Sequence, residues 1–174
     1  MAPPIVSGSV YDGLARSLVL SHKRSLVRSL ARPLADLLNR GIDLLPTPAE
    51  PIWLVPIPAH RAALRTRGQD TVAAIAGYAA RQRGWAGVHG ALAFRQESGT
   101  LTGLNRVQRA ARMHDAFRAE RGRNRLCIVV DDVITSGATV RSAMEALLRA
   151  DWRIHGAAAV AGVVAADRTM GGQR

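Results

Sequence analysis

The chain has very little cysteine and very little lysine. Its 174 residues include one cysteine, Cys127, which excludes an internal disulfide and any zinc site built from several cysteines. Lys23 is the only lysine, in a chain whose other permanently charged basic side chains are all arginines. Because Lys23 stands in the sequence Ser-His-Lys-Arg, the chain has no G-x-x-x-x-G-K-[ST] motif, and a P-loop nucleotide site is excluded.

Long apolar segments are also missing. The longest uncharged stretch, from Ile154 to Ala166, contains two glycines and is shorter than the roughly 20 residues that a membrane-spanning helix needs. The first residues, Met1-Ala2-Pro3-Pro4, lack the basic and apolar regions of a secretory signal peptide. We therefore expect a cytoplasmic protein with no membrane partner, in which Cys127 is a buried thiol of the core.

Acidic residues are few relative to basic ones, and the net charge is +11. Three explanations are open: a polyanionic ligand, contact with nucleic acid, or an arginine-rich composition without a dedicated partner. Aromatic residues make up only 4% of the chain, which leaves few rings on which the bases of a single strand could stack. We favour composition combined with a polyphosphate ligand.

The apolar pattern predicts one α/β domain over residues 1–174, with flexible ends at 1–10 and 167–174. Strands that alternate with helices indicate a parallel sheet flanked by helices. The expected helices are Tyr11–Leu20, Ser25–Leu38, Gln69–Arg81, Asn105–Met113 and Ala138–Ala150. The expected strands are Ile52–Ile57, Gly90–Phe94, Leu126–Val130 and Ala157–Ala165. A linker is expected at Asn39–Pro51, a loop at Gln96–Gly103 and a charged turn at Arg118–Arg125. The helix near position 140 is expected to bury Leu147 and Leu148.

The most informative segment extends from Leu126 to Thr139 and reads L-C-I-V-V-D-D-V-I-T-S-G-A-T. Its first five residues are apolar, which indicates a strand covered on both faces, as in a parallel sheet. Asp131 and Asp132 follow at the carboxyl end of this strand, where open α/β sheets bind their ligands. The segment therefore predicts a ligand site at this edge of the sheet.

The turn after the two acids has the features of a phosphate-binding cradle. Backbone N–H groups at the start of a helix favour an anion, hydroxyl groups add donors, and a glycine lets the backbone approach closely. The cradle residues are Thr135, Ser136, Gly137, Ala138 and Thr139. Asp131 and Asp132 would repel a phosphate beside them, so they suit sugar hydroxyls or a hydrated Mg²⁺. The plain alternative is a strand, a turn and a helix with nothing bound, although two ionised neighbours at a strand end are costly without a partner.

Basic residues follow the strand at Ile52–Ile57. Arg61, Arg65 and Arg67 come directly after it, and the carboxyl ends of parallel strands meet at one edge of the sheet. Guanidinium groups match the oxygens of a phosphate in geometry and charge. We expect these arginines to hold a pyrophosphate near the acid pair, and we expect Lys23 to be an ordinary surface residue.

Together these segments resemble the ComF family, a group similar to amidophosphoribosyltransferases and linked with competence for DNA uptake. The resemblance covers the chain from Tyr11 to about Ala165. It is carried by Tyr11–Lys23, by V-P-I-P with the following basic residues and R-G over Val55–Gly68, by Gly103–Arg109 with Ala116-Phe117, and by Leu126–Thr139. The last of these looks like the motif with which type I phosphoribosyltransferases bind phosphoribosyl pyrophosphate (PRPP).

The resemblance implies a type I phosphoribosyltransferase-like fold with a small hood from the N-terminal segment. It implies that Asp131 and Asp132 are the catalytic residues, which hold the ribose hydroxyls of PRPP and bind Mg²⁺ through water. The cradle would hold the 5′-phosphate while phosphoribosyl is transferred to a nitrogen acceptor. The alternative is a non-catalytic protein that senses PRPP or a nucleotide, or that contacts DNA or the competence machinery. A homodimer is common in the wider fold class.

The chain also departs from the family pattern. The four-cysteine zinc ribbon that usually opens the family is missing, so either the chain begins after it or the ribbon has been lost. Gln69-Asp70-Thr71 stand where the family has Phe-Asn-Gln. Some purine-salvage relatives have a carboxylate base at the position of Thr135, which cannot act as a base at neutral pH. The resemblance thus supports PRPP binding more than any particular acceptor.

Overall fold

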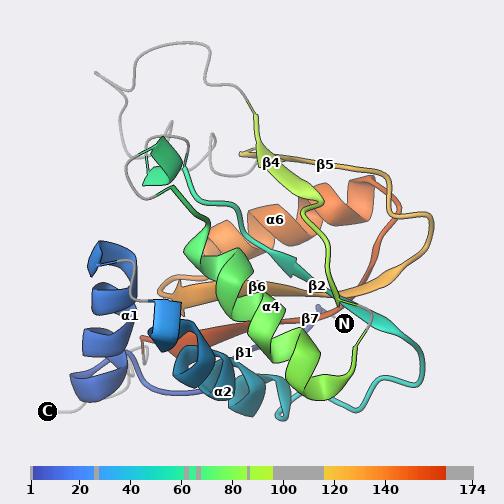
Figure 1. Ribbon diagram of the computed structural model, residues 1–174. Helices are drawn as coiled ribbons and strands as arrows, with labels where there is room; N and C mark the ends of the chain where they lie inside the picture. Colours follow the sequence, from blue (N-terminus) through green and yellow to red (C-terminus); the bar gives the residue numbers. More distant parts are fainter. Residues whose placement is uncertain are drawn as a thin grey trace, which may run out of the picture.

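The computed structural model describes residues 2–25, 28–60, 63–65, 68–85, 87–95 and 116–163. These residues form a five-stranded parallel sheet with helices on both faces (Figure 1). Two further strands pair in a small antiparallel sheet. The α/β class and the parallel sheet expected from the sequence are therefore confirmed.

The segment with the two acids forms the central strand of the sheet. The strands stand in the order β1 (Ile5–Ser7), β7 (Arg153–Gly162), β6 (Leu126–Ile134), β2 (Ile52–Pro56) and β3 (Gly87–Val88). Strand β6 therefore has a parallel neighbour on each side. Helices cover both of its faces, so every residue from Cys127 to Val130 is buried, which explains the continuous apolar run in the sequence.

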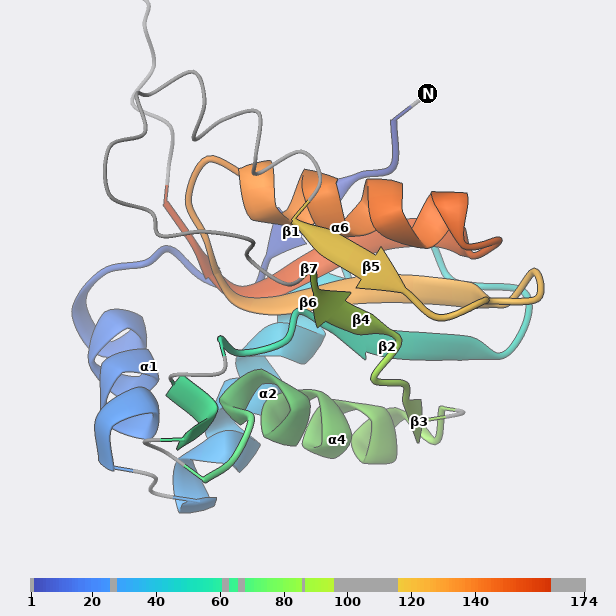
Figure 2. The same cartoon turned by 90° about the horizontal axis from the view of Figure 1, so that it is seen from above.

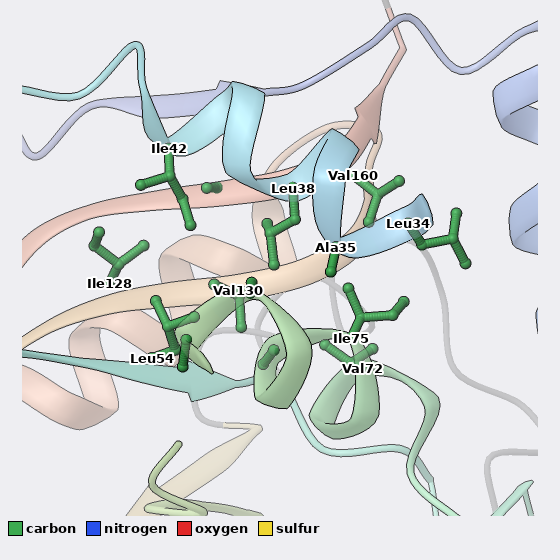
Figure 3. Packing of buried hydrophobic residues seen from close by; sticks show 14 of the residues in the cluster. Leu34, Ala35, Leu38, Ile42, Leu54, Val72, Ile75, Ile128, Val130 and Val160 are labelled. Carbon is green, nitrogen blue, oxygen red and sulfur yellow. The ribbon is translucent and has the colours of Figure 1, made fainter. Parts of the chain in front are cut away.

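Helices α2 (Ala31–Ile42) and α4 (Thr71–Arg83) cover one face of the sheet, and α6 (Ala138–Arg149) covers the other (Figure 2). Figure 3 shows the first of the two resulting core layers, in which side chains of both helices meet those of the strands. The labelled residues are Leu34, Ala35, Leu38, Ile42, Leu54, Val72, Ile75, Ile128, Val130 and Val160.

The second core layer lies between the sheet and α6. Cys127 and Val129 of β6 pack there with Ala143 and Leu147 of α6, because successive residues of a strand point to opposite faces. Burial raises the pKa of Cys127 to about 12, so this thiol is protonated at neutral pH. The expectation of a core thiol is confirmed.

The small antiparallel sheet pairs β4 (Leu92–Phe94) with β5 (Phe117–Ala119). Leu92 and Phe117 are buried in the core layer on the α6 side. The loop expected at Gln96–Gly103 and the helix expected at Asn105–Met113 lie outside the described residues. The expectation that a charged turn begins at Arg118 is wrong, because residues 117–119 are paired in a strand.

Helix α1 (Gly13–Ser25) stands at the edge of the sheet where β6 and β7 end (Figures 1 and 2). Its approach is fixed by a hydrogen bond of 2.8 Å from the N–H of Tyr11 to the carbonyl oxygen of Gly162. Val19 is buried in the core layer on the α2 side, whereas Leu14 is exposed. The helix begins two residues later than expected and continues to Ser25.

Two expectations about the first part of the chain are wrong. Residues 1–10 were expected to be flexible, yet Ile5–Ser7 form strand β1, which pairs in parallel with Ala157–Ala159 of β7. The linker expected from Asn39 onward begins later, because α2 continues to Ile42.

The chain after β1 passes close to α2 at two glycines. A Cβ on Gly8 would lie 1.7 Å from the carbonyl oxygen of Leu37, and a Cβ on Gly41 would lie 2.8 Å from the backbone nitrogen of Gly8. Gly41 therefore lets the backbone of α2 contact the backbone of Gly8. In the sequence, the same glycine indicates the end of a helix.

Helix α6 ends within one residue of its expected boundary. Leu147 is fully buried as expected, but Leu148 is 52% exposed, so the expectation for Leu148 is wrong. In the part of the chain that the structure describes, no helix is long and apolar enough to cross a membrane.

Candidate functional site

The two acids lie inside the last half of β6. The strand was expected to end at Val130, but it continues to Ile134, and Asp131 pairs in register with Ala159 of β7. Asp132 is buried and Asp131 is partly buried. Because neighbouring strand residues point to opposite faces, the two carboxyl groups leave the backbone in different directions.

Asp132 has a partner that the sequence did not indicate. The Lys23 ammonium of α1 lies 2.6 Å from Oδ2 of Asp132, so the only lysine of the chain forms an ion pair at the site. The Lys23 side chain is 31% exposed and the Asp132 side chain is 9% exposed. The expectation that Lys23 is an ordinary surface residue is wrong, and the pair ties α1 to the edge of the sheet.

Asp131 is in a different electrostatic environment. Its Oδ1 accepts a 2.8 Å hydrogen bond from the backbone N–H of Asp132. Burial, followed by repulsion from the Asp132 carboxylate, raises the pKa of Asp131 to about 7, although that hydrogen bond and Lys23 favour ionisation. A carboxyl group with this pKa changes its charge close to neutral pH.

This raised pKa predicts how stability depends on pH. Between about pH 4 and 7 the folded protein retains a proton on Asp131 that the unfolded chain releases, so this group stabilises the fold less as pH rises. We therefore compare the free energy of unfolding of Asp131→Asn with that of the wild type at two pH values. The difference in favour of Asp131→Asn should be larger at pH 8 than at pH 4.5. The ceiling is about 4 kcal/mol, from roughly three pKa units at 1.36 kcal/mol each.

Urea unfolding at several pH values measures this effect. The exposed acid Asp151, replaced by asparagine, serves as a control for the loss of one negative charge. Parallel pH curves for the wild type and Asp131→Asn would show that the carboxyl group titrates normally.

The turn after the acid pair leads directly into α6. Gly137 occupies the N-cap position with a φ of 72°, a left-handed conformation that favours glycine. The first turn of α6 contains no acidic residue, and its N-cap residue, a glycine, makes no side-chain cap hydrogen bond. The Ser136 hydroxyl accepts a long hydrogen bond of 3.4 Å from the N–H of Ala138. The hydroxyl-bearing residues Thr135 and Ser136 are exposed, so the turn presents donors and an uncompensated helix dipole to solvent.

Arg141 adds positive charge at this turn. Its Nη2 donates a 2.5 Å hydrogen bond to the carbonyl oxygen of Ser136, and its Nη1 lies beside Gly137. A guanidinium in the first turns of a helix is electrostatically unfavourable without an anion nearby. The cradle residues expected from the sequence, Thr135–Thr139, follow the acid pair closely in the chain, and Arg141 lies beside them.

The loop after β2 lies next to the acid pair. The N–H of Ile57 donates to the carbonyl oxygen of Val130, directly before Asp131, at 2.9 Å. Arg65 lies in a short helical stretch of this connection, residues 63–65, and is exposed, and no contact joins it to the acid pair within the described residues. Arg61 and Arg67 lie outside the described residues. Of the three arginines expected to hold pyrophosphate, only Arg65 therefore lies among the described residues, on the connection after β2.

Asp70 fixes the end of this loop, and the sequence interpretation missed its role. Its Oδ1 accepts from the N–H of Ala73, as an N-cap of α4, and its Oδ2 accepts from the N–H of Ala59, both at 3.0 Å. An aspartate before an apolar helical pattern is a typical N-cap signal, so this contact could have been predicted in part. Lys23 and Arg141 carried no comparable local signal.

The acid pair does not by itself form a closed metal site. Among the described residues, no group of three or more His, Cys, Asp or Glu side chains could hold a metal ion. Lys23 already neutralises one of the two carboxylates. Mg²⁺ keeps several waters and is bound in proteins through one or two carboxylates together with phosphate oxygens. Asp131 and Asp132 thus fit a hydrated Mg²⁺ shared with a phosphorylated ligand.

No protein-family model matches the chain, and no curated protein matches it significantly.

Proposed function

We propose that the chain is a PRPP-binding protein with a type I phosphoribosyltransferase-like fold, which transfers phosphoribosyl to a nitrogen acceptor and releases pyrophosphate. One observation carries this proposal. The acid pair of the central strand and the acid-free start of α6, whose N-cap is a glycine, lie five residues apart at one edge of the sheet. PRPP has the complementary groups, a ribose diol next to a 5′-phosphate.

Each part of the site has a role in this proposal. Asp131 and Asp132 accept hydrogen bonds from the ribose hydroxyls, and the turn Thr135–Thr139 binds the 5′-phosphate through backbone N–H and hydroxyl donors. Arg65, with Arg61 and Arg67, holds the pyrophosphate. Helix α1 contributes a small hood over the site.

The reaction breaks the bond between C1 of the ribose and the pyrophosphate oxygen, and the bond electrons leave with pyrophosphate. The acceptor nitrogen bonds to C1 through an oxocarbenium-like transition state and loses its proton to solvent. Mg²⁺, when bound, would offset negative charge on the pyrophosphate. In this proposal the acid pair holds the ribose while positive charge develops at C1, so the chain acts mainly by orientation and charge stabilisation.

A second function is favoured by one particular position. Thr135 stands where a carboxylate base would be expected for purine salvage, and its exposed hydroxyl cannot accept a proton at neutral pH. A protein that binds PRPP or a nucleotide without turnover, and acts through DNA or protein contacts, fits this residue and the +11 charge. Salt-sensitive DNA binding without pyrophosphate release would distinguish this function.

Calorimetric titration with PRPP, with and without Mg²⁺, tests the shared part of both functions. We expect magnesium-dependent binding in the micromolar range, followed by pyrophosphate release once a suitable nitrogen acceptor is present. A folded sample that binds no PRPP under either condition would contradict the proposal. The same preparation gives the oligomeric state, for which we propose a homodimer, and we propose the cytoplasm as the location.

A further inference from the structure

The ion pair between Lys23 and Asp132 places a strong donor directly beside a strong acceptor. The ammonium and Oδ2 are 2.6 Å apart, and the two residues come from distant parts of the chain, α1 and β6. The carboxylate is nearly buried, whereas almost a third of the lysine side chain is exposed. A ligand can therefore reach the pair from the side of α1.

The pair has capacity for further hydrogen bonds. An ammonium has three N–H donors and a contact with one carboxylate oxygen uses one of them, while a carboxylate has about four acceptor positions. A hydroxyl group donates and accepts at the same oxygen, so it can bond to both members of the pair. Few other ligand groups have this double character.

Charge selects a hydroxyl over a phosphate at this position. Lys23 and Asp132 cancel each other's charge, and Asp131 directly precedes Asp132 in the chain, so the immediate surroundings are neutral or negative. A phosphate oxygen would be repelled by the carboxylates, although Lys23 alone would attract it. The nearest strong anion position is the cradle at the start of α6.

We propose that Lys23 is a specificity-determining residue that recognises the diol of the ribose together with Asp132. The Lys23 ammonium donates to a hydroxyl oxygen, and the Asp132 carboxylate accepts the proton of the same hydroxyl. This inference rests on the proposed function, because it requires a phosphorylated ribose in the site. It also assigns a role to the only lysine of the chain, whose compact ammonium carries three rotatable donors.

Two small phosphates that differ only in the diol provide the test. One is 1,4-anhydroribitol 5-phosphate, which has both ring hydroxyls, and the other is tetrahydrofurfuryl phosphate, which has neither. In the absence of metal we expect the wild type to prefer the diol compound by about tenfold or more, the typical effect of a hydrogen bond to a charged group. Lys23→Met should reduce this preference about tenfold and leave the affinity for tetrahydrofurfuryl phosphate unchanged.

Arg24→Met is the matched control. Arg24 is the next residue of α1 and is exposed, so its replacement changes the net charge equally without touching Asp132. Its preference for the diol compound should equal that of the wild type. Thermal melting of all variants shows whether Lys23→Met remains folded.

A second measurement uses the wild type alone and decides the question if Lys23→Met does not fold. Because Lys23 is the only lysine, its acetylation can be followed at one site by mass spectrometry. We expect the diol compound to slow acetylation of Lys23 about tenfold and tetrahydrofurfuryl phosphate to have little effect.

The outcomes distinguish the binding of a phosphorylated ribose from the role of Lys23. A wild type that binds neither phosphate contradicts the proposed function and this inference with it. A wild type that prefers the diol, together with Lys23→Met that keeps the full preference, would overturn the role of Lys23 and leave the proposed function intact. Equal acetylation rates with both compounds would overturn it in the same way.

Discussion

The double variant Asp131→Asn/Asp132→Asn is expected to lose PRPP binding while remaining folded. Asparagine has the size of aspartate, and its amide oxygen can still accept the hydrogen bond from the backbone N–H at position 132. It has no charge with which to hold ribose hydroxyls or a hydrated metal ion. With two hydrogen bonds to charged groups lost, at about 1.5–3 kcal/mol each, the affinity should fall by at least about a hundredfold.

The free energy of unfolding of this variant should not fall with its affinity for PRPP. Asp131 is costly to ionise in the folded protein, and Lys23 is exposed enough to remain hydrated without Asp132. The control Asp43→Asn/Asp151→Asn makes the same change of net charge at two exposed positions away from the acid pair. Calorimetric titration with PRPP and urea unfolding measure both properties. An affinity equal to that of the wild type would contradict the assignment of the site.

Gly8→Ala is expected to destabilise the fold strongly. The added Cβ would lie 1.7 Å from the carbonyl oxygen of Leu37 and 2.6 Å from its carbonyl carbon, and both belong to the backbone of α2. No rotamer change can relieve this clash, so β1 and α2 must separate. Overpacking typically costs about 1–3 kcal/mol, and a backbone obstacle places this variant at or above the upper end.

Gly77→Ala is the control for this prediction, and it should change stability in the opposite direction. Gly77 lies in the interior of α4, and a Cβ there would meet only Nη1 of Arg81, at 3.6 Å. Replacing a helical glycine by alanine should stabilise the protein by about 0.5–1 kcal/mol. Urea midpoints that shift in opposite directions for the two variants are expected. A Gly8→Ala midpoint equal to that of the wild type would show that β1 does not pack against α2 in this way.

The central part of the fold was predictable from the sequence for physical reasons. Strand β2 and helices α4 and α6 begin and end within about two residues of their expected positions, because their apolar periodicity and turn residues agree. The acid pair, the glycine turn and the start of α6 are contiguous in sequence, so their neighbourhood required no knowledge of tertiary structure.

Features that depend on distant contacts were not predictable. Strand β1 has three residues and exists because β7 pairs with it, and no local pattern marks so short a strand. Lys23 looks like a surface residue of a helix until α1 is placed beside the end of β6. Leu148 fits the apolar stripe of α6 but lies beyond the surface that the sheet covers.

The pairing of β1 with β7 has a consequence for the synthesis of the protein. Ile5 and Ala157 are partners, so the residues of β1 leave the ribosome roughly 150 residues before the strand that holds them. During that interval β1 has no strand to pair with, and Lys23 of α1 reaches its partner Asp132 only on a sheet that still lacks β7. Translation alone therefore delays completion of the site until β7 has emerged, and nascent chains that stop before β7 should be sensitive to proteases at their N-terminal segment.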